Sequence, residues 1–226
     1  MNVILFGTTG MVGQGVLREC LLDPGVERVL CVGRNAIGRQ HPKVREVVQA
    51  DLFDIVPIEG QLQGYDACFF CLGVSSVGMT EDAYRRVTHD LTLNVARTLA
   101  RLNPGMTFVY VSGAGTDSSE QGRSMWARVK GATENALLKL PFKAAYMFRP
   151  GVIVPLHGIT SKTPIYRIFY TLARPIWRPL HTAFPRAITT TEQVGRAMLC
   201  AARKGAPKSI LESADINALL QATSTV

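Results

Sequence analysis

The sequence predicts an α/β protein built on a doubly wound parallel sheet, with a small C-terminal cap region. Three observations support this fold class. Apolar runs alternate with segments of helical periodicity, several of these runs are apolar throughout, and the first run leads directly into a glycine-rich turn. Strands that are apolar on both sides are typical of a parallel sheet covered by helices on both faces. The alternation itself is typical of right-handed crossover connections.

The elements follow from this pattern in chain order. Strands are expected near Asn2–Phe6, Arg28–Gly33, Val44–Ala50, Tyr65–Cys71, Met106–Ser112 and Lys143–Phe148. Helices are expected near Met11–Leu22, Glu81–Leu102, Ser124–Leu140 and Thr191–Arg203, the last with Thr191 as its N-cap. A last strand near Lys208–Leu211 and a short helix complete the pattern. Because no linker or repeat interrupts the 226 residues, we expect a single domain over residues 1–226.

Composition limits the class of protein. The chain is 47% hydrophobic and 19% charged, which excludes global disorder. A net charge of +8 is compatible with nucleic acid, an anionic surface or a phosphorylated ligand as partner. The five cysteines are odd in number and mostly lie in apolar surroundings. This cysteine usage, together with the lack of a recognisable signal peptide or membrane span, predicts a cytoplasmic location.

A glycine-rich turn is the first candidate functional feature of the chain. Gly7, Gly10 and Gly13 are spaced G-x-x-G-x-x-G between the first strand and the first helix. In a diphosphate site they allow a tight turn, close approach of backbone to the pyrophosphate, and packing of helix on sheet. The helix N-terminus adds unpaired N–H groups. We therefore predict a dinucleotide site of the Rossmann type, bound by Gly7, Thr9, Gly10, Met11, Val12 and Gly13; the alternative is a tight turn without a ligand.

The end of the second strand bears on which dinucleotide binds. An NAD site usually has an acidic residue there for the ribose hydroxyls. No Asp or Glu lies between Glu27 and Glu46, whereas Arg34 follows the strand directly and Arg39 lies nearby. A guanidinium is suited to clamping a 2′-phosphate. We therefore predict NADP rather than NAD, with an ordinary solvated loop arginine as the alternative for Arg34.

Two later strand ends are expected beside the same cofactor. Asp51 and Leu52 close the third strand, where the adenine ring would lie, although Asp51 is equally suited to capping a turn. Cys71, Leu72 and Gly73 follow the fourth strand, beside the ribose and pyrophosphate. Cys68 and Cys71 form a C-x-x-C, but in a strand they point to opposite faces and are expected to be buried rather than redox-active.

Several segments together resemble a known family. They are Thr8–Gly13, Cys71–Gly73, Val111-Ser112, Lys130-Gly131 with Glu134, and Arg149–Gly151. With these segments the chain resembles the atypical, NAD(P)-binding, epimerase/dehydratase-like short-chain dehydrogenases/reductases, and within them the Tat-interacting oxidoreductase-like branch. The resemblance covers nearly the whole chain. It also implies that Lys130, Pro150, Gly151 and Val152 contact the cofactor, and that residues 152–190 form a cap on the substrate side.

The resemblance implies a catalytic serine, tyrosine and lysine. Ser112 and Lys130 match the serine and the lysine, but Trp126 stands at the tyrosine position. An indole N–H donates only and does not relay a proton. Three interpretations stay open: another group (Tyr84, Tyr110, His89 or Lys130) supplies the proton, the chemistry proceeds without that relay, or the protein binds NADP without catalysis. Whether the chain is an enzyme that acts on a small carbonyl or hydroxyl substrate is left open.

A basic segment follows. No acid lies between Glu134 and Glu192, whereas residues 139–186 contain eight cations, and an amphipathic helix is expected from Pro164. A cap packed on the core is one interpretation; an anionic substrate, an anionic surface or an acidic protein partner are others. No nucleic-acid motif and no metal-ligand spacing is recognisable, so we predict neither partner. Monomer and dimer both stay open.

Overall fold

The computed structural model describes residues 1–160 and 187–221. These residues form a seven-stranded sheet in the order β3-β2-β1-β4-β5-β6-β9, in which every neighbouring pair is parallel. The strands are β1 (Asn2–Phe6), β2 (Arg28–Gly33), β3 (Val44–Val48), β4 (Ala67–Phe70), β5 (Thr107–Val111), β6 (Ala144–Arg149) and β9 (Ile210–Glu212). The strand order reverses at β1, which lies between β2 and β4. This arrangement confirms the predicted doubly wound, Rossmann-type sheet.

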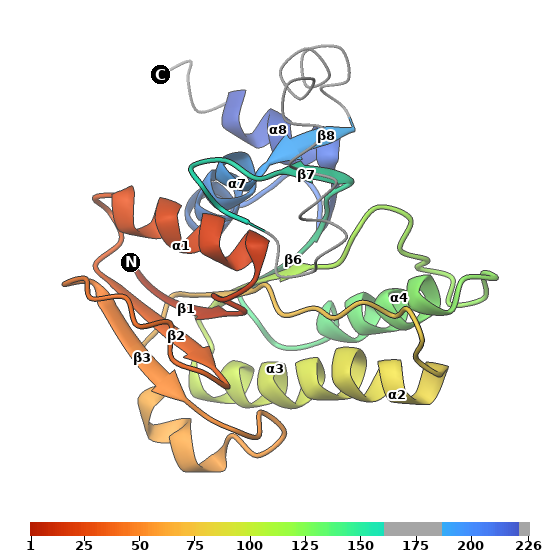
Figure 1. The fold of residues 1–226 in the computed structure, drawn as a ribbon, viewed down its shortest axis with the longest axis horizontal. Coiled ribbons are helices and arrows are strands. Elements are labelled where there is room, and N and C mark those ends of the chain that lie inside the picture. The colour runs from red at the N-terminus through yellow and green to blue at the C-terminus, as the bar shows by residue number, and fades with distance from the viewer. Residues whose placement is uncertain (161–186, 222–226) are drawn as a thin grey trace.

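Helices cover both faces of the sheet (Figure 1). One face carries α1 (Met11–Leu22), α7 (Thr191–Lys204) and α8 (Ser213–Gln221); the other carries α2 (Glu81–Arg85), the π-helical turn η2 (Arg86–Asp90), α3 (Leu91–Leu102) and α4 (Met125–Leu137). The residues of β1 alternate between the two cores: Val3 and Leu5 pack with α1 and α7, whereas Ile4 and Phe6 pack with α3. The apolar β1 run is therefore explained by burial on both sides.

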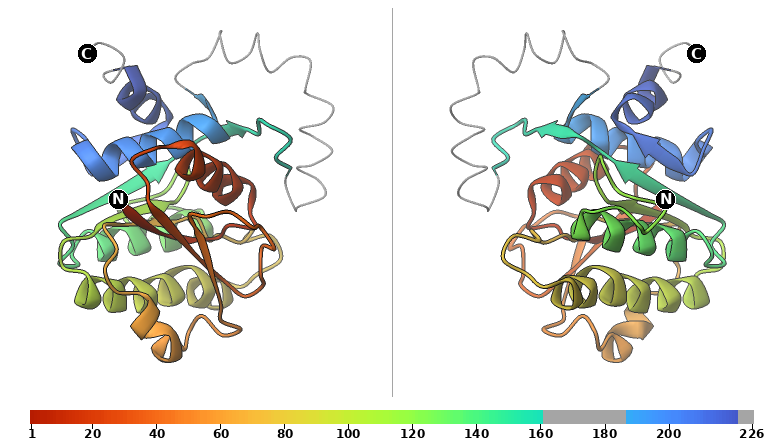
Figure 2. Two further views of the ribbon diagram at one scale, coloured as in Figure 1. Left: turned by 90° about the vertical axis from the view of Figure 1, so that its left-hand side faces the viewer. Right: turned by 90° about the vertical axis from the view of Figure 1, so that its right-hand side faces the viewer.

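Helices α1 and α7 lie side by side on their face of the sheet (Figure 2). Two glycines allow this close approach. A Cβ on Gly15 would lie 2.6 Å from the Cβ of Thr191, and a Cβ on Gly195 would lie 2.7 Å from the Cγ of Glu19. At the far ends of the helices, Arg203 forms two hydrogen bonds of 2.7 and 2.6 Å to the carboxylate of Asp23.

The predicted cap region contains structure that its weak periodicity did not indicate. Strands β7 (Val152–Val154) and β8 (Ile188–Thr190) come from the two ends of the segment and pair in parallel. They form a separate two-stranded sheet. The helix expected from Pro164 lies outside the described residues, as do the cations at 162–186.

Two helix predictions need correction. The N-cap of α7 is Thr190 rather than Thr191: Thr190 is extended, its Oγ1 accepts the Gln193 N–H, and the Gln193 side chain accepts the Thr190 N–H. Thr191 is instead fully buried, and its Oγ1 accepts the Leu156 N–H at 3.1 Å. The segment Glu81–Leu102 is not one regular α-helix, because η2 separates α2 from α3.

The remaining differences concern element ends. Strands β3, β4 and β5 are each shorter than predicted, α4 ends at Leu137, and a short 3₁₀ helix, η1 (Val56–Gln61), follows β3. Over residues 1–160 and 187–221, no helix is both long and apolar enough to cross a membrane.

Candidate functional site

The carboxyl ends of the strands gather the predicted residues at one edge of the sheet. The turn after β1 meets the turn after β4 there. Gly7 has a φ of +83°, and a Cβ at this position would lie 2.5 Å from the carbonyl oxygen of Cys71. A Cβ on Gly13 would lie 2.1 Å from the carbonyl oxygen of Gly7. Both glycines are therefore required by the packing of the chain on itself.

The N-terminus of α1 presents its backbone N–H groups at this edge. Gly10 is the N-cap, with an extended backbone, and its own N–H donates to the carbonyl of Gly7 at 2.9 Å. Within the described residues no side chain caps the helix, and its first turn contains no acidic residue. The N–H groups of the first turn thus have no intrahelical partner. This geometry suits a diphosphate.

The ends of β2 and β3 place the predicted adenosine-side residues. Arg34 is exposed directly after β2, and no ion pair to another described residue occupies it. Asp51 is also exposed, but its Oδ1 accepts the N–H of Phe53 at 2.9 Å, as in a turn. Leu52 points into the core and is 3% exposed. The turn interpretation therefore accounts for Asp51 without a ligand.

The two cysteines at the end of β4 pack on opposite faces of the sheet, as the sequence predicts. Cys68 packs in the core on the α3 side, and Cys71 packs against the core on the α1 side. Burial raises the pKa of both thiols, which disfavours redox chemistry. After Leu72, Gly73 lies beside open space, because a Cβ there would have no neighbour within 4 Å. A ligand can approach the backbone at this position.

Ser112 and Lys130 are brought together after β5. The Nζ of Lys130 donates to the main-chain carbonyl of Ser112 at 2.6 Å and lies 6.0 Å from the centre of the Tyr110 ring. Burial lowers the pKa of Lys130 to about 8, and the nearby carboxylate of Glu134 opposes this shift. The Ser112 hydroxyl does not point at Lys130; its contacts are to Glu134 Oε1 at 2.5 Å and to the carbonyl of Phe148 at 3.1 Å.

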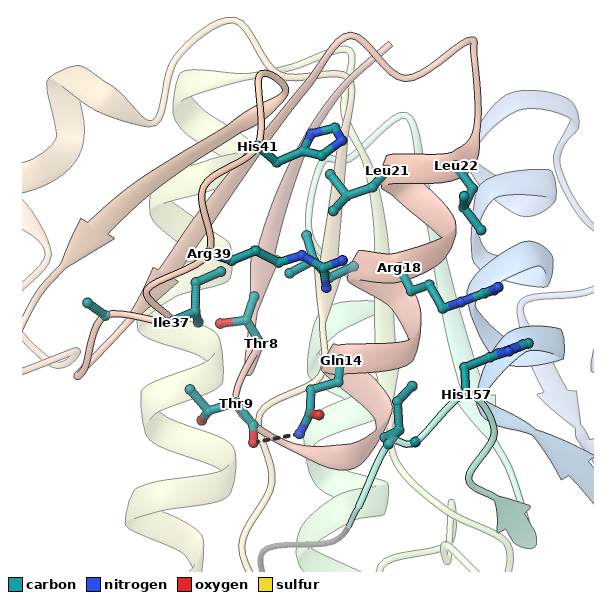
Figure 3. A pocket seen from close by; sticks show the side chains of 14 residues that line it. Thr8, Thr9, Gln14, Arg18, Leu21, Leu22, Ile37, Arg39, His41 and His157 are labelled. Atoms are coloured by element: carbon teal, nitrogen blue, oxygen red, sulfur yellow. Dashed lines mark hydrogen bonds between the residues drawn. The ribbon is translucent and has the colours of Figure 1, made fainter.

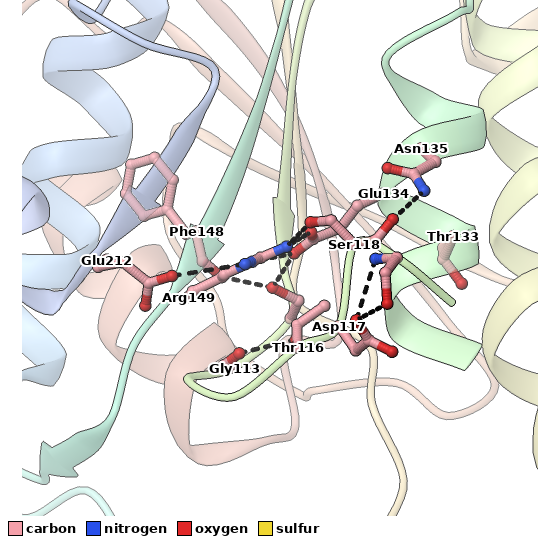
Figure 4. Close-up of polar contacts among 12 residues, drawn as sticks. Gly113, Thr116, Asp117, Ser118, Thr133, Glu134, Asn135, Phe148, Arg149 and Glu212 are labelled. Carbon is pink, nitrogen blue, oxygen red and sulfur yellow. Dashed lines mark hydrogen bonds and ion pairs between the residues drawn. The ribbon is translucent and has the colours of Figure 1, made fainter. Parts of the chain in front are cut away.

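Glu134 belongs to a buried charged cluster that the sequence analysis missed (Figure 4). Its carboxylate is fully buried and accepts the Nε–H of Arg149, 3.1 Å from each oxygen, and an Nη2–H as well. Arg149 is 8% exposed, also donates to Ser118 Oγ at 2.5 Å, and lies 3.5 Å from Glu212. Arg149 is one of the eight cations of the segment 139–186, but it is buried and paired with two carboxylates, so it adds no charge to an exposed basic surface.

Trp126 lies beside this edge on the first turn of α4. Its ring passes close to Gly115, where an added Cβ would lie 3.5 Å from the indole. The tyrosines considered as proton donors are buried: Tyr84 and Tyr110 are 2% and 1% exposed, and burial raises the pKa of both. The Nδ1 of His89 is 2.8 Å from Asp90 Oδ1. Neither tyrosine hydroxyl is open to solvent.

The segment after β6 contacts the loop after β5 at the same edge of the sheet. Pro150 is buried and its carbonyl accepts the N–H of Ala114 at 2.9 Å. Gly151 donates its N–H to Ser213 Oγ at 2.8 Å, and Val152 is 40% exposed at the start of β7. These contacts tie the loop after β5 to the loop after β6.

A cavity of about 720 Å³ runs along the outer side of α1 (Figure 3). It lies between the helix, the loop that carries Ile37 and Arg39, and the turn at His157. Of the predicted cofactor residues only Thr9 lines it, next to Gln14, whose Nε2 donates to the Thr9 carbonyl at 3.2 Å. The cavity adjoins the glycine-rich turn but does not contain the Lys130 cluster. Across the described ranges, no group of three or more His, Cys, Asp or Glu residues is arranged to hold a metal ion.

Comparisons with known proteins agree with the resemblance noted from the sequence. The rat protein HTATIP2 is 28% identical over 155 residues, which make up 68% of this chain and 63% of that protein, just under two thirds of its length. The "Protein FMP52, mitochondrial" of Eremothecium gossypii is 27% identical over 229 residues and the whole length of both chains. The crystal structure of the Bordetella bronchiseptica enzyme WbmF in complex with NAD⁺ superposes with a TM-score of 0.67 at 18% identity, over 99% of this chain and 78% of that one.

The prediction of a cytoplasmic location is wrong by these comparisons. Several fungal relatives, including the one that aligns over the whole chain, carry names that describe them as mitochondrial. The sequence reasoning relied on reduced cysteines and on a missing signal peptide. Neither feature separates the cytoplasm from other compartments that keep thiols reduced.

A family model identifies the class of protein. The model described as the NAD dependent epimerase/dehydratase family matches residues 3–125, more than half of the chain. The match includes the glycine-rich turn, Arg34 and Ser112, and ends just before Trp126 and Lys130. The chain belongs to the NAD dependent epimerase/dehydratase family.

Proposed function

We propose that this chain is an NADP-dependent oxidoreductase that acts on a small carbonyl or hydroxyl substrate. The observation that carries the proposal is the meeting of three features at one edge of the sheet. These are the uncapped N-terminus of α1, the exposed Arg34 after β2, and the Lys130–Ser112 contact after β5. The first two suit a phosphorylated dinucleotide, and the third provides a titratable donor beside it.

Each part of the edge has a distinct task in this proposal. The N–H groups of α1 hold the diphosphate, and Arg34 pairs with the 2′-phosphate. Gly73 leaves room for the ribose, whose hydroxyls accept hydrogen bonds from Lys130. When bound, the nicotinamide supplies or accepts a hydride. Lys130 has a pKa of about 8, so it is suited to giving or taking the accompanying proton near neutral pH.

Titration of NADPH and NADH against tryptophan fluorescence tests the choice of cofactor. We expect Arg34→Ala to weaken NADPH binding by about 1.5–3 kcal/mol, the scale of a hydrogen bond between charged groups, and to leave NADH unaffected. Arg45→Ala is the matched control, because it removes the same charge from the exposed side of β3, away from its carboxyl end. Equal losses of NADPH and NADH in Arg34→Ala would contradict the 2′-phosphate clamp.

Trp126 favours a second function, a non-catalytic NADP-binding module with a regulatory or interaction role. Its indole stands where the family has a proton-relaying tyrosine, and neither Tyr84 nor Tyr110 opens to solvent. Turnover distinguishes the two functions. If the purified wild-type protein oxidises NADPH with a panel of small aldehydes and ketones, the non-catalytic function is excluded; binding without turnover across that panel would favour it.

Two further proposals concern the C-terminal half. Residues 152–190 would cover the substrate, since β7 and β8 begin and end this segment beside Gly151. The basic segment 139–186 would contact an anionic surface or an acidic protein, without the contribution of the buried Arg149. Binding to vesicles with and without anionic lipid, at two salt concentrations, tests the second proposal, because surface electrostatics weaken with ionic strength.

A further inference from the structure

Every polar group of Ser112 is engaged within the protein. Its N–H donates to the carbonyl of Phe148 at 2.9 Å, and its own carbonyl accepts the Lys130 ammonium at 2.6 Å. Its hydroxyl has one proton and two neighbours, Glu134 Oε1 and the Phe148 carbonyl, and both of these only accept. The proton therefore stays inside the protein, where a charged carboxylate holds it more strongly than a neutral ligand would.

Glu134 is itself fixed in place. It is fully buried on α4, and Arg149 holds both of its oxygens from β6. Arg149 is held in turn by Ser118 and Glu212 (Figure 4). A buried carboxylate with an ion-pair partner and a hydroxyl donor has no freedom to turn toward a ligand. The cluster thus forms a rigid support beneath the end of β5.

Gly131 brings this support close to the site. A Cβ on Gly131 would lie 1.7 Å from the carbonyl of Asp117, so α4 approaches the loop after β5 as closely as backbone permits. Lys130 precedes Gly131 and Glu134 follows one turn later. The two side chains therefore reach the same strand end, Lys130 at the Ser112 carbonyl and Glu134 at the Ser112 hydroxyl.

We propose that Glu134 is a positioning residue, which holds the Ser112 hydroxyl inward so that Ser112 serves the site through its main-chain carbonyl, on which Lys130 is fixed. Lys130 has three N–H donors; the Ser112 carbonyl takes one of them, which leaves two to donate to a ligand. This inference rests on the proposed function and refines it: Ser112 supports Lys130 rather than donating to the substrate.

The charges around Lys130 make the proposal measurable. Glu134 on the same helix is the carboxylate that raises its pKa against burial. From β5 the ring of Tyr110 faces Lys130. Tyr84 of α2 lies close enough to Tyr110 to contribute to the raised pKa of Tyr110. Burial raises the pKa of both tyrosines, so they stay neutral while Lys130 titrates. From β6, the guanidinium of Arg149 faces Glu134 and contacts both of its carboxylate oxygens.

The decisive comparison is between Ser112→Ala and Glu134→Gln, measured first without cofactor. The readout is the titration of the Lys130 side chain by NMR, assigned with Lys130→Met. We expect Glu134→Gln to shift the midpoint downward and Ser112→Ala to leave it unchanged, because alanine keeps the carbonyl. An unchanged midpoint in Glu134→Gln would overturn the positioning role. If Glu134→Gln does not fold, the double variant Glu134→Gln with Arg149→Met, which removes both buried charges, takes its place.

Ligand binding and turnover complete the test. We expect Ser112→Ala to weaken NADPH binding, and to lower kcat/KM where turnover is measurable, by no more than about 10-fold, the scale of one lost internal hydrogen bond, because alanine keeps the carbonyl that fixes Lys130. A loss of kcat/KM of about 100-fold or more in Ser112→Ala, with the Lys130 midpoint unchanged, would show that the hydroxyl contacts the substrate and would overturn the proposal. If wild-type protein binds no NADPH, the proposed function fails, whereas the Lys130 titration still decides the role of Glu134.

Discussion

Replacing Gly13 and Gly10 separately with alanine distinguishes the two tasks of the glycine-rich turn. Gly13 is on the first turn of α1 facing the chain, whereas Gly10 is the N-cap facing the proposed diphosphate. A Cβ on Gly13 would lie 2.1 Å from the Gly7 carbonyl oxygen and 3.0 Å from the Thr8 Cα, both backbone atoms. A Cβ on Gly10 would meet only the Gly7 oxygen, at 3.3 Å.

The expected magnitudes follow from these distances. Overpacking destabilises a folded protein by about 3 kcal/mol at the upper end of its usual range, and replacing a helical glycine by alanine stabilises the helix by about 1 kcal/mol. Gly13→Ala is therefore expected to lose about 2 kcal/mol, or about 4–8 °C in melting temperature for a chain of this size. Gly10 has an extended backbone that alanine also adopts without strain. Gly10→Ala is therefore expected to lose only about 0.5–1 kcal/mol of N-cap preference, or about 1–4 °C in melting temperature.

For NADPH affinity the order should be reversed: Gly10→Ala should weaken binding more than Gly13→Ala. The methyl of Gly10→Ala would fill the space through which a diphosphate reaches the α1 N–H groups. Losing one such charge-assisted hydrogen bond costs about 1.5–3 kcal/mol, so the NADPH dissociation constant should rise about 10- to 150-fold. Melting curves and fluorescence titrations of both variants at one pH provide the measurements. If Gly10→Ala binds NADPH as wild type does, the turn is a structural feature and the diphosphate assignment is refuted.

Three other perturbations test separate parts of the structure. NADPH affinity should fall as pH rises through about 8 and Lys130 loses its charge, and this step should be missing in Lys130→Met; a step that persists in the variant would assign it to another group. Trp126→Tyr should raise the rate of carbonyl reduction by NADPH, since it adds a hydroxyl that can relay a proton four residues before Lys130; an unchanged rate would mean that Trp126 does not occupy the relay position. Arg203→Ala should cost up to about 1 kcal/mol at neutral pH, and urea titrations should show this difference vanish at low pH. Arg203 holds the folded-state pKa of Asp23 below its usual value, so the contribution is present above about pH 4 and is lost as pH falls through that lower pKa.

Much of the fold was predictable because it depends on local pattern. The boundaries of β1, β2 and α1 match the sequence prediction residue for residue, since an apolar run, a glycine turn and an amphipathic helix each carry their own signal. The strands β7 and β8 were not predicted. Each has three residues, and they pair across a long stretch of chain, so neither window contained enough residues to establish a period of two.

The positions of the candidate site residues in the fold were predictable where a residue belongs to a local turn or directly follows a strand. Gly7 to Gly13 and Arg34 lie where the pattern placed them. The Glu134–Arg149 cluster was missed because the charge of each residue was interpreted in its own sequence neighbourhood, whereas their pairing joins α4 to β6. Two signals pointed to it: Glu134 is the last acid before the acid-free stretch, and Arg149 ends an otherwise apolar strand.

Fewer residues of the glycine-rich turn point to a ligand than the motif suggests. Gly7 and Gly13 would have to be glycine even in a protein that binds nothing, because the chain packs against them at 2.5 and 2.1 Å. Packing makes no such demand at Gly10 or Gly73, and none at the exposed Arg34. These three positions carry the case for a phosphorylated dinucleotide. The case for catalysis rests on different atoms, the Lys130 ammonium and whatever proton source compensates for the indole at position 126, so binding and turnover can be present or absent independently.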